Sequence, residues 1–459
     1  MKFFRKNGNH IFPFFIFIFA LFIRLWNFSD VEFKLDEALA IFKASQFWFT
    51  GQLPLAGLIS STLAANSPLF IYLLMPLTLI SSNPLFVTFF FVLGGSFTVL
   101  LTYQLLKKYS PVWALFSAGL FATSAWPILF SRKIWAQNFL PLFSVLILYF
   151  ADRLYNKKNK KVILSLIILS LWAFQIHFSG FLVIPFVLLV LILTKVKIEA
   201  KTVVLGLLFG LLPFLPYLIR QFQNGFADFI LLFGSQTQGY FDIHSFTSPF
   251  RIVAGFYFAR VLQADYLEFI QSIPLGKFVF VIFNLQSLLV ILGFLIALSK
   301  GKKFLLLNLF FGLMLITSFL SRRPALPFYE ELFFPLIFAF AGLCLWQIFQ
   351  IKKWGRLISG FIFIACLSAN LVFIFSFYSF VHLKEQINGD YGLVFRKKED
   401  LVQKSIKDYP NHQTKQKLTV ALRVIYSISN FDKKENKYLP QKELVPIVNK
   451  ELINFKFGD

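Results

Sequence analysis

Acidic residues are scarce in this sequence of 459 residues, which contains 22 Asp and Glu against 45 Lys and Arg. Cysteine is scarcer still, since only Cys344 and Cys366 are present and both lie in apolar stretches. Neither a disulfide framework nor a metal-binding cysteine cluster is therefore predicted. The sequence also contains no internal repeat, no low-complexity segment and no glycine-rich phosphate loop. A nucleotide site of the P-loop kind is therefore excluded.

Hydrophobic residues dominate instead: they make up 57% of the chain, and the mean hydropathy is +0.70. This composition excludes an ordinary soluble domain and indicates a protein that crosses the membrane several times. The net charge of +23 would suit a nucleic-acid-binding protein. However, the Lys and Arg residues lie mainly in short runs between apolar stretches and in the C-terminal segment, where such runs orient a membrane protein. We expect membrane lipid, and no nucleic acid, as a partner.

Apolar stretches, most of about 17–25 residues, predict about eleven transmembrane helices. The first follows a basic N-terminus, and no small-residue cleavage site comes after it, so we expect it to be retained as a signal anchor. The predicted spans are residues 11–27, 85–106, 111–130, 136–154, 162–178, 180–194, 202–221, 276–299, 304–320, 332–350 and 357–381.

Every second connection between these spans is basic. Basic connections favour the cytoplasmic side, so these connections and the N-terminus are predicted to lie inside. The assignment holds only if residues 68–82, a short stretch with Pro68 and Pro76, do not cross the membrane; we expect them to be interfacial or re-entrant. The basic connections are residues 107–108, 156–161, 195–201, 300–303 and 352–356.

The remaining connections face outward. Within the long outer segment 222–275, residues 250–272 alternate apolar and charged positions and predict a helix along the membrane surface. The fold class predicted is thus an all-α polytopic membrane domain, residues 1–381, followed by a small extracytoplasmic α/β domain, residues 382–459. The long outer segments are residues 28–84, 222–275, 321–331 and 382–459.

Asp36 and Glu37 form the most informative pair, because they are adjacent carboxylates in the first outer segment of an otherwise basic protein. The segment that follows, residues 38–49, could form an amphipathic helix in the membrane interface. The pair would then lie at the helix N-terminus, where the helix dipole favours carboxylates. The pair could simply cap the helix, but a carboxylate fixed in this way is also a well-placed general base.

Two pairs of cations lie on the outer side, against the usual distribution: Arg132 with Lys133, and Arg322 with Arg323. The first pair could snorkel at the interface, and the second could pair with the neighbouring glutamates. Alternatively, both pairs bind a phosphate, to which arginine makes bidentate contacts.

Three further polar residues lie on the outer side. His177 occupies a tight turn, where it either has a structural role or donates a hydrogen bond to a phosphate or sugar. Tyr329 and Glu330 share a loop with the second arginine pair and are candidates for binding an acceptor or sugar.

Taken together, residues 10–380 resemble the GT-C superfamily of polytopic glycosyltransferases. The nearest group is the branch of protein O-mannosyltransferases and aminoarabinose transferases, glycosyltransferase family 39 and its relatives. Two positions depart from that pattern: Lys133 replaces an acidic residue, and Asn66 with Ser67 replaces a His-Pro pair. The resemblance rests on Arg24, Asp36 and Glu37, residues 66–72, residues 131–135, residues 175–177 and Pro185.

The resemblance implies a polyprenyl-phosphate-sugar donor and a hydroxyl acceptor on a lipid, glycan or protein at the outer face of the cytoplasmic membrane. Asp36 would be the general base, and Glu37 would orient the acceptor or Asp36. Because Asn66 departs from the His-Pro pair, the family's acceptor contacts do not carry over to it, and Asn66 is a candidate for binding the acceptor or sugar on its own position. His177 and the outer cations would hold the donor phosphate. No cofactor follows from the residues, and a divalent metal stays open.

Three other functions remain open at this point. A lipid-linked oligosaccharide ligase or polymerase of the cell envelope differs from the first hypothesis only in the size of the transferred unit. A transporter would place ionisable residues near the bilayer midplane, and here the spans carry almost no charge. A non-catalytic membrane scaffold would tolerate neutralisation of Asp36.

Overall fold

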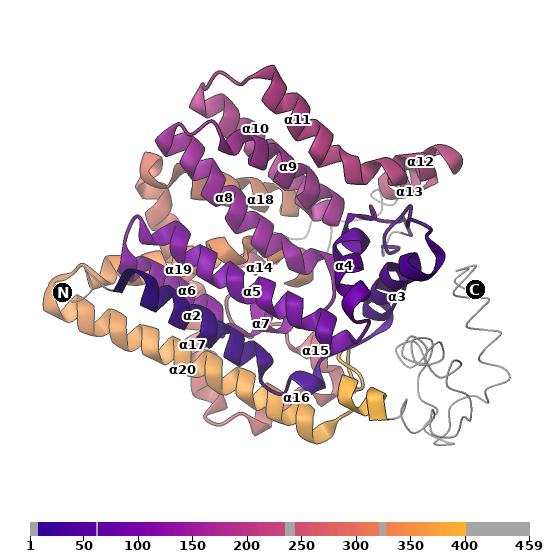
Figure 1. The fold of residues 1–459 in the computed structure, drawn as a ribbon. Helices are drawn as coiled ribbons and strands as arrows, with labels where there is room; N and C mark the ends of the chain where they lie inside the picture. Colours follow the sequence, from indigo (N-terminus) through magenta and orange to yellow (C-terminus); the bar gives the residue numbers. More distant parts are fainter. Residues whose placement is uncertain (1–7, 61–62, 235–243, 321–326, 401–459) are drawn as a thin grey trace.

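The computed structural model describes residues 8–60, 63–234, 244–320 and 327–400, and this part of the chain is almost entirely helical (Figure 1). No β-strand occurs among the described residues, which form only three isolated β-bridges. The all-α prediction for the membrane part is therefore confirmed. The helices are α2 (Gly8–Leu25), α3 (Leu35–Thr50), α4 (Leu69–Ile80), α5 (Pro84–Lys107), α6 (Pro111–Thr123), α7 (Ala125–Phe130), α8 (Leu140–Lys157), α9 (Val162–Ile176), α10 (Val183–Thr194), α11 (Ala200–Leu211), α12 (Leu215–Gln223), α13 (Ala227–Gly234), α14 (His244–Arg251), α15 (Ala259–Leu262), α16 (Tyr266–Ser272), α17 (Gly276–Ser299), α18 (Leu305–Leu320), α19 (Phe334–Phe349) and α20 (Lys352–Lys384).

Helical segments occupy all eleven predicted spans. Five of those in the described part of the chain are long and apolar enough to cross a membrane: α5, α17, α20, the continuous pair α11 and α12, and α19 with its preceding turn. Other apolar helices, among them α6, α9 and α10, are shorter. These helices indicate a multi-pass membrane protein, and the number of crossings stays a prediction.

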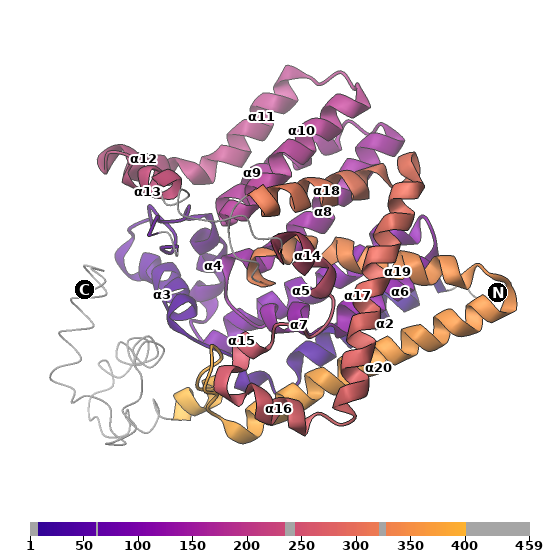
Figure 2. The same ribbon diagram turned by 180° about the vertical axis from the view of Figure 1, so that it is seen from behind.

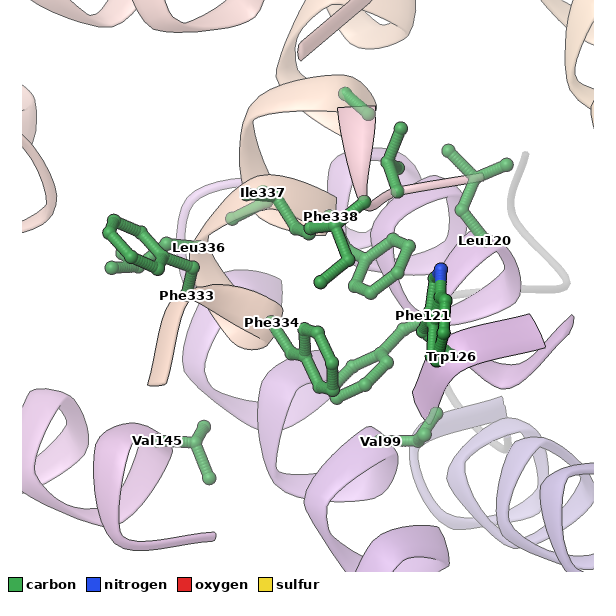
Figure 3. Packing of buried hydrophobic residues seen from close by; sticks show 14 of the residues in the cluster. Val99, Leu120, Phe121, Trp126, Val145, Phe333, Phe334, Leu336, Ile337 and Phe338 are labelled. Carbon is green, nitrogen blue, oxygen red and sulfur yellow. The ribbon is translucent and has the colours of Figure 1, made fainter. Parts of the chain in front are cut away.

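Helix α19 lies at the centre of the bundle, between α6 and α17, and is the most buried of the five candidate spans. Figure 3 shows Phe334 and Phe338 of α19 beside Phe121 of α6, and the Phe338 ring stacks on the Phe121 ring with centroids 4.7 Å apart. The close approach of α17 to α19 depends on Gly293, where a Cβ atom would collide with the backbone carbonyl of Phe340. Small residues commonly allow such contacts between membrane helices.

The predicted span 111–130 is broken into α6 and α7 at Ser124, whose backbone is extended. The break is compensated by hydrogen bonds to the segment before α15: Ser124 Oγ donates to the Val253 carbonyl at 2.8 Å, and Trp126 Nε1 donates to the Phe256 carbonyl at 2.6 Å. The helix is therefore interrupted at the point where the segment before α15 packs against it.

The segment before α15 corrects one expectation. Residues 250–272 do not form a single surface helix; the chain is divided among the end of α14, a turn, α15 and α16 (Figure 2). Val253 and Phe258 are completely buried, and the side chains of Ser124 and Trp126 give the backbone carbonyls of this segment donors that a lipid surface would not. The alternating pattern therefore reflected packing inside the protein.

The basic connections meet at one end of the bundle. Lys108 pairs with Asp152, and Lys158 Nζ donates to the Thr194 carbonyl at 3.1 Å. The rings of Tyr109 and Phe304 lie 5.8 Å apart. The end of α5 therefore adjoins both the end of α8 and the turn before α18, as the charge pattern predicts for connections on one side. That this side is cytoplasmic stays a prediction.

Helices α3, α4, α12 and α13 gather at the opposite end, at the right of Figure 1. Residues 68–82 form the short helix α4, which packs against α3. The expected C-terminal domain begins inside α20, which ends at Lys384. Residues 385–400 fold back on the first outer segment, and residues 401–459 lie outside the described residues, so an α/β domain there stays a prediction.

Candidate functional site

A cavity of about 260 Å³ opens at the end of the bundle that carries α3 and α4. Its wall is built by five segments far apart in the sequence: the start of α3, residues 58–60 together with 66–70, and the turns at 135–137, 176–178 and 328–329. Four of the predicted site residues line it together, namely Asp36, Asn66, His177 and Tyr329. Aromatic side chains flank these polar ones, a composition common in small-molecule sites.

Asp36 is the second residue of α3, and its side chain is exposed at the cavity wall. Its pKa is nevertheless raised, because the surrounding protein excludes part of its hydration. The positive charges of Lys34 and Lys133 oppose this rise, and the negative charge of Glu32 adds to it. A carboxylate of raised basicity at the wall of a cavity is suited to accept a proton.

Glu37 occupies the opposite environment, since it is completely buried and does not line the cavity. Its Oε2 atom accepts a hydrogen bond from the backbone N–H of Lys34 at 3.0 Å and so caps the start of α3. Its Oε1 atom has no partner among the described residues. Burial, reinforced by the negative charge of Glu32, raises the pKa of Glu37 to about 7.

Behind Asp36, Glu32 and Lys133 form a buried ion pair. Glu32 also pairs with Lys34 at 2.6 Å. Burial alone would raise the pKa of Glu32, but the two ammonium groups outweigh it and hold that pKa below its usual range. The Lys133 ammonium also lies 4.4 Å from the centre of the Trp135 ring, at the edge of the cavity. The predicted phosphate-binding lysine thus already has a carboxylate partner.

Arg132 is buried as well, and its guanidinium donates to the carbonyls of Trp26 and Asn27, each at 2.7 Å. It also lies 4.3 Å from the centre of the Tyr378 ring. The two carbonyls follow the end of α2, so Arg132 joins that end to the turn after α7. Its predicted contact with a donor phosphate stays a prediction.

The loop that contributes Leu58 and Asn66 to the cavity wall is held in place by two sets of hydrogen bonds. From α3, Lys43 Nζ donates to the Gly57 carbonyl at 2.7 Å. Within the loop, Asn66 Nδ2 donates to the Leu58 carbonyl at 3.0 Å. Asn66 therefore shapes the wall and also faces the cavity.

The second set of hydrogen bonds to this loop comes from α12 and α13, which bind the backbone of Ala65. Tyr217 Oη donates to the Ala65 carbonyl at 2.8 Å, and the Ala65 N–H donates to Asp228 Oδ1 at 3.0 Å. The loop position next to Asn66 is therefore fixed on both its backbone groups.

Two other segments of the wall carry His177 and Tyr329. The His177 Nδ1 atom hydrogen-bonds with Ser179 Oγ at 2.7 Å and accepts from the Ser179 N–H at 3.3 Å. A neutral imidazole with Nδ1 as acceptor carries its proton on Nε2. Beside this wall, the Trp135 and Phe328 rings meet edge to face, 6.0 Å apart.

Other predicted residues lie away from the cavity or outside the described residues. Glu330 is buried and accepts a hydrogen bond from Ser248 Oγ, and burial raises its pKa to about 8. Arg322 and Arg323 fall in the segment 321–326, outside the described residues. Sequence reasoning missed Glu32 as the partner of Lys133, because no spacing rule relates two residues about a hundred positions apart.

No three His, Cys, Asp or Glu side chains form a metal-binding group in the described ranges. The cavity offers one carboxylate together with amide, hydroxyl, imidazole and aromatic groups. This set can accept a proton at one point and hydrogen-bond a polyhydroxylated ligand around it.

No protein-family model matches the sequence, and no curated protein sequence is detectably similar to it. Known structures are similar in fold. The crystal structure of ArnT from Cupriavidus metallidurans bound to undecaprenyl phosphate superposes with a TM-score of 0.55 at 10% identity, over 98% of this chain and 88% of ArnT. The apo state of the same ArnT gives a TM-score of 0.52 at 10% identity, over 92% and 78% of the two chains.

The oligosaccharyltransferase of Archaeoglobus fulgidus, in complex with Zn and sulfate, gives a TM-score of 0.52 at 12% identity over 88% of this chain. This chain spans only 57% of the length of that protein. The likeness shows that the chain has the GT-C fold, as the resemblance implied. At these identities it does not show the activity.

Proposed function

We propose that this protein is a membrane glycosyltransferase that moves a sugar from a polyprenyl-phosphate donor to an acceptor hydroxyl at the outer face of the cytoplasmic membrane. The observation that carries the proposal is the position of Asp36: an exposed carboxylate of raised pKa, at the wall of a polar and aromatic cavity in a GT-C fold. The binding of undecaprenyl phosphate by the structurally similar ArnT supports a polyprenyl-phosphate donor.

In the proposed reaction, the acceptor oxygen attacks the anomeric carbon of the donor while Asp36 takes the proton from the acceptor hydroxyl. The bond between the anomeric carbon and the phosphate oxygen breaks, and polyprenyl phosphate leaves with the bonding electrons. The sugar–phosphate bond is already activated, so the reaction needs no nucleotide. Glu37 caps α3 and thereby fixes the direction of Asp36.

The leaving phosphate needs cationic partners, since negative charge grows on it as the bond breaks. We assign this role to Arg322 and Arg323, with Lys133 contributing its charge from behind the Trp135 wall. His177 would donate a hydrogen bond from Nε2 to the phosphate or the sugar, and Asn66 and Tyr329 would contact the sugar or acceptor.

The size of the cavity favours transfer of one sugar unit. At about 260 Å³ it is smaller than the roughly 300–1,000 Å³ of typical sites for drug-sized ligands. An oligosaccharide donor would place its first residue inside and its other residues outside, without contacts to the cavity lining. The proposal is therefore a monosaccharide donor, with oligosaccharide transfer as the alternative.

The test is release of polyprenyl phosphate in proteoliposomes supplied with undecaprenyl-phosphate mannose, glucose or arabinose and with cell-envelope extract as acceptor. We expect release by the wild type and a loss of roughly 10²–10⁴-fold in Asp36→Asn, the usual contribution of a general base. The control is Glu268→Gln, whose exposed carboxylate pairs with Lys384 far from the cavity lining.

Equal release by the wild type and Asp36→Asn would contradict the assignment of Asp36. No release from these monosaccharide donors, but release when a lipid-linked oligosaccharide is supplied in their place, would favour the ligase alternative. Movement of intact donor across the bilayer, without release of phosphate, would favour a transporter.

A further inference from the structure

The segment that follows the last long helix, residues 385–398, lies against the first outer loop, and we call it the C-terminal strap. Its Phe395 N–H donates to the Val31 carbonyl at 3.0 Å. Val394 forms an antiparallel β-bridge with Glu32, the buried partner of Lys133. The strap therefore pairs by backbone with the loop that leads into α3, more than 350 positions earlier in the sequence.

Polar side chains pin the strap to the same loop. Asp30, almost completely buried, is contacted by Arg396 Nε of the strap at 2.9 Å and by Nδ1 of His382, near the end of α20, at 2.6 Å. Tyr391 Oη donates to the Asp30 carbonyl at 2.6 Å. A buried carboxylate with several partners is expensive to release, so this contact holds the loop firmly.

The strap ends at the start of α3. Lys398 is 7% exposed, and its ammonium donates to the Phe33 carbonyl. The next residue, Lys34, is the N-cap whose N–H is bound by Glu37, and Asp36 follows two residues later. Burial lowers the pKa of Lys398 to about 8, while the negative charges of Glu37 and Glu32 oppose that fall.

We propose that the C-terminal strap supports the catalytic site through Lys398, a positioning residue that fixes the first turn of α3 and thereby the direction of Asp36. Lys398 does not line the cavity, so it acts through α3 and not on the substrate. The inference rests on the proposed role of Asp36. A displacement of about 1 Å in a catalytic group is enough to cost roughly 100-fold in rate.

Lys398→Met tests the proposal, since it keeps the apolar stem and removes the ammonium. The matched control is the neighbouring Lys397→Met, because the Lys397 ammonium is more exposed and pairs with Glu385 at 2.9 Å. Lys398→Arg is the rescue variant. Hydrogen exchange of residues 33–38, measured on the full chain in lipid nanodiscs, reports on the first turn of α3 without requiring activity.

We expect faster exchange in residues 33–38 of Lys398→Met than in the wild type, Lys397→Met or Lys398→Arg. In the release assay we expect kcat to fall about tenfold or more with the donor KM unchanged, because positioning and not binding is lost.

Equal exchange and equal kcat in Lys398→Met and Lys397→Met would overturn the proposal. If Lys398→Met does not fold, Arg396→Gln loosens the strap by removing the contact of the partly exposed Arg396 with the buried Asp30, and the same faster exchange in residues 33–38 is expected. If the wild type releases no phosphate at all, the proposed function fails, and the exchange experiment still decides whether the strap holds α3.

Discussion

At the scale of single residues, the site depends on two adjacent carboxylates in different environments. Asp36 is exposed at the cavity wall, whereas Glu37 is buried and caps α3. Successive side chains of a helix point in directions about 100° apart. The first turn of α3 can therefore place Asp36 at the cavity wall while the next residue, Glu37, is buried and caps the helix. The sequence predicted both roles, but their separation depends on the structure.

Glu37→Gln should change stability in a pH-dependent way. The folded state raises the pKa of Glu37 from 4.5 to about 7, so its contribution to stability is full below the unfolded pKa and is lost as pH rises through the folded pKa. At 1.36 kcal/mol per pKa unit, the loss in the wild type approaches about 3 kcal/mol. Glutamine can still accept from the Lys34 N–H and does not ionise.

The measurement is thermal unfolding in detergent at about pH 5 and about pH 8, on either side of the Glu37 transition. We expect the Tm of Glu37→Gln, relative to that of the wild type, to rise between the two pH values. Glu268→Gln, at an exposed position, should show no such trend. A difference that is independent of pH would mean that Glu37 does not ionise in this range.

At the scale of elements, the apolar lengths predicted the helical spans well, because in a membrane only backbone that satisfies its own hydrogen bonds can span. The break between α6 and α7 was not predictable. It depends on hydrogen bonds from Ser124 and Trp126 to backbone groups about 130 residues away, and these leave no local pattern. The same long-range pairing explains why residues 252–255 and Phe258 are buried.

The end of α2 provides a prediction that separates two roles of Arg132. If the role of Arg132 is to bind the Trp26 and Asn27 carbonyls, Arg132→Lys should lower the Tm of the protein by several degrees, since hydrogen bonds with a charged group contribute about 1.5–3 kcal/mol each. The donor KM should then change by less than about twofold. Thermal unfolding and donor titration of the same preparation measure both. A raised donor KM with unchanged Tm would instead assign Arg132 to the phosphate.

At the scale of the whole molecule, the predicted outer turns meet at one cavity while the basic connections meet at the other end. The charge pattern predicted this division. It also predicted that Asp36, Asn66, His177 and Tyr329 lie at the same end of the bundle, but it did not show that they line one cavity. The strap was not predictable, because the pairing of Asp30 with Arg396 joins the two ends of the described chain. The distribution of basic residues predicts on which side of the membrane a segment lies, but it does not predict which other segment it contacts.

The orientation itself can be tested by cysteine labelling. The native Cys344 and Cys366 are both buried, so background reaction with a membrane-impermeant maleimide should be low. Gln52 is exposed beyond the end of α3, and Lys160 is exposed in the basic connection after α8. We expect Gln52→Cys to react in intact cells and Lys160→Cys to react only after permeabilisation, because basic connections stay in the cytoplasm. The reverse result would place Asp36 inside, and the donor would then have to be presented from the cytoplasmic leaflet.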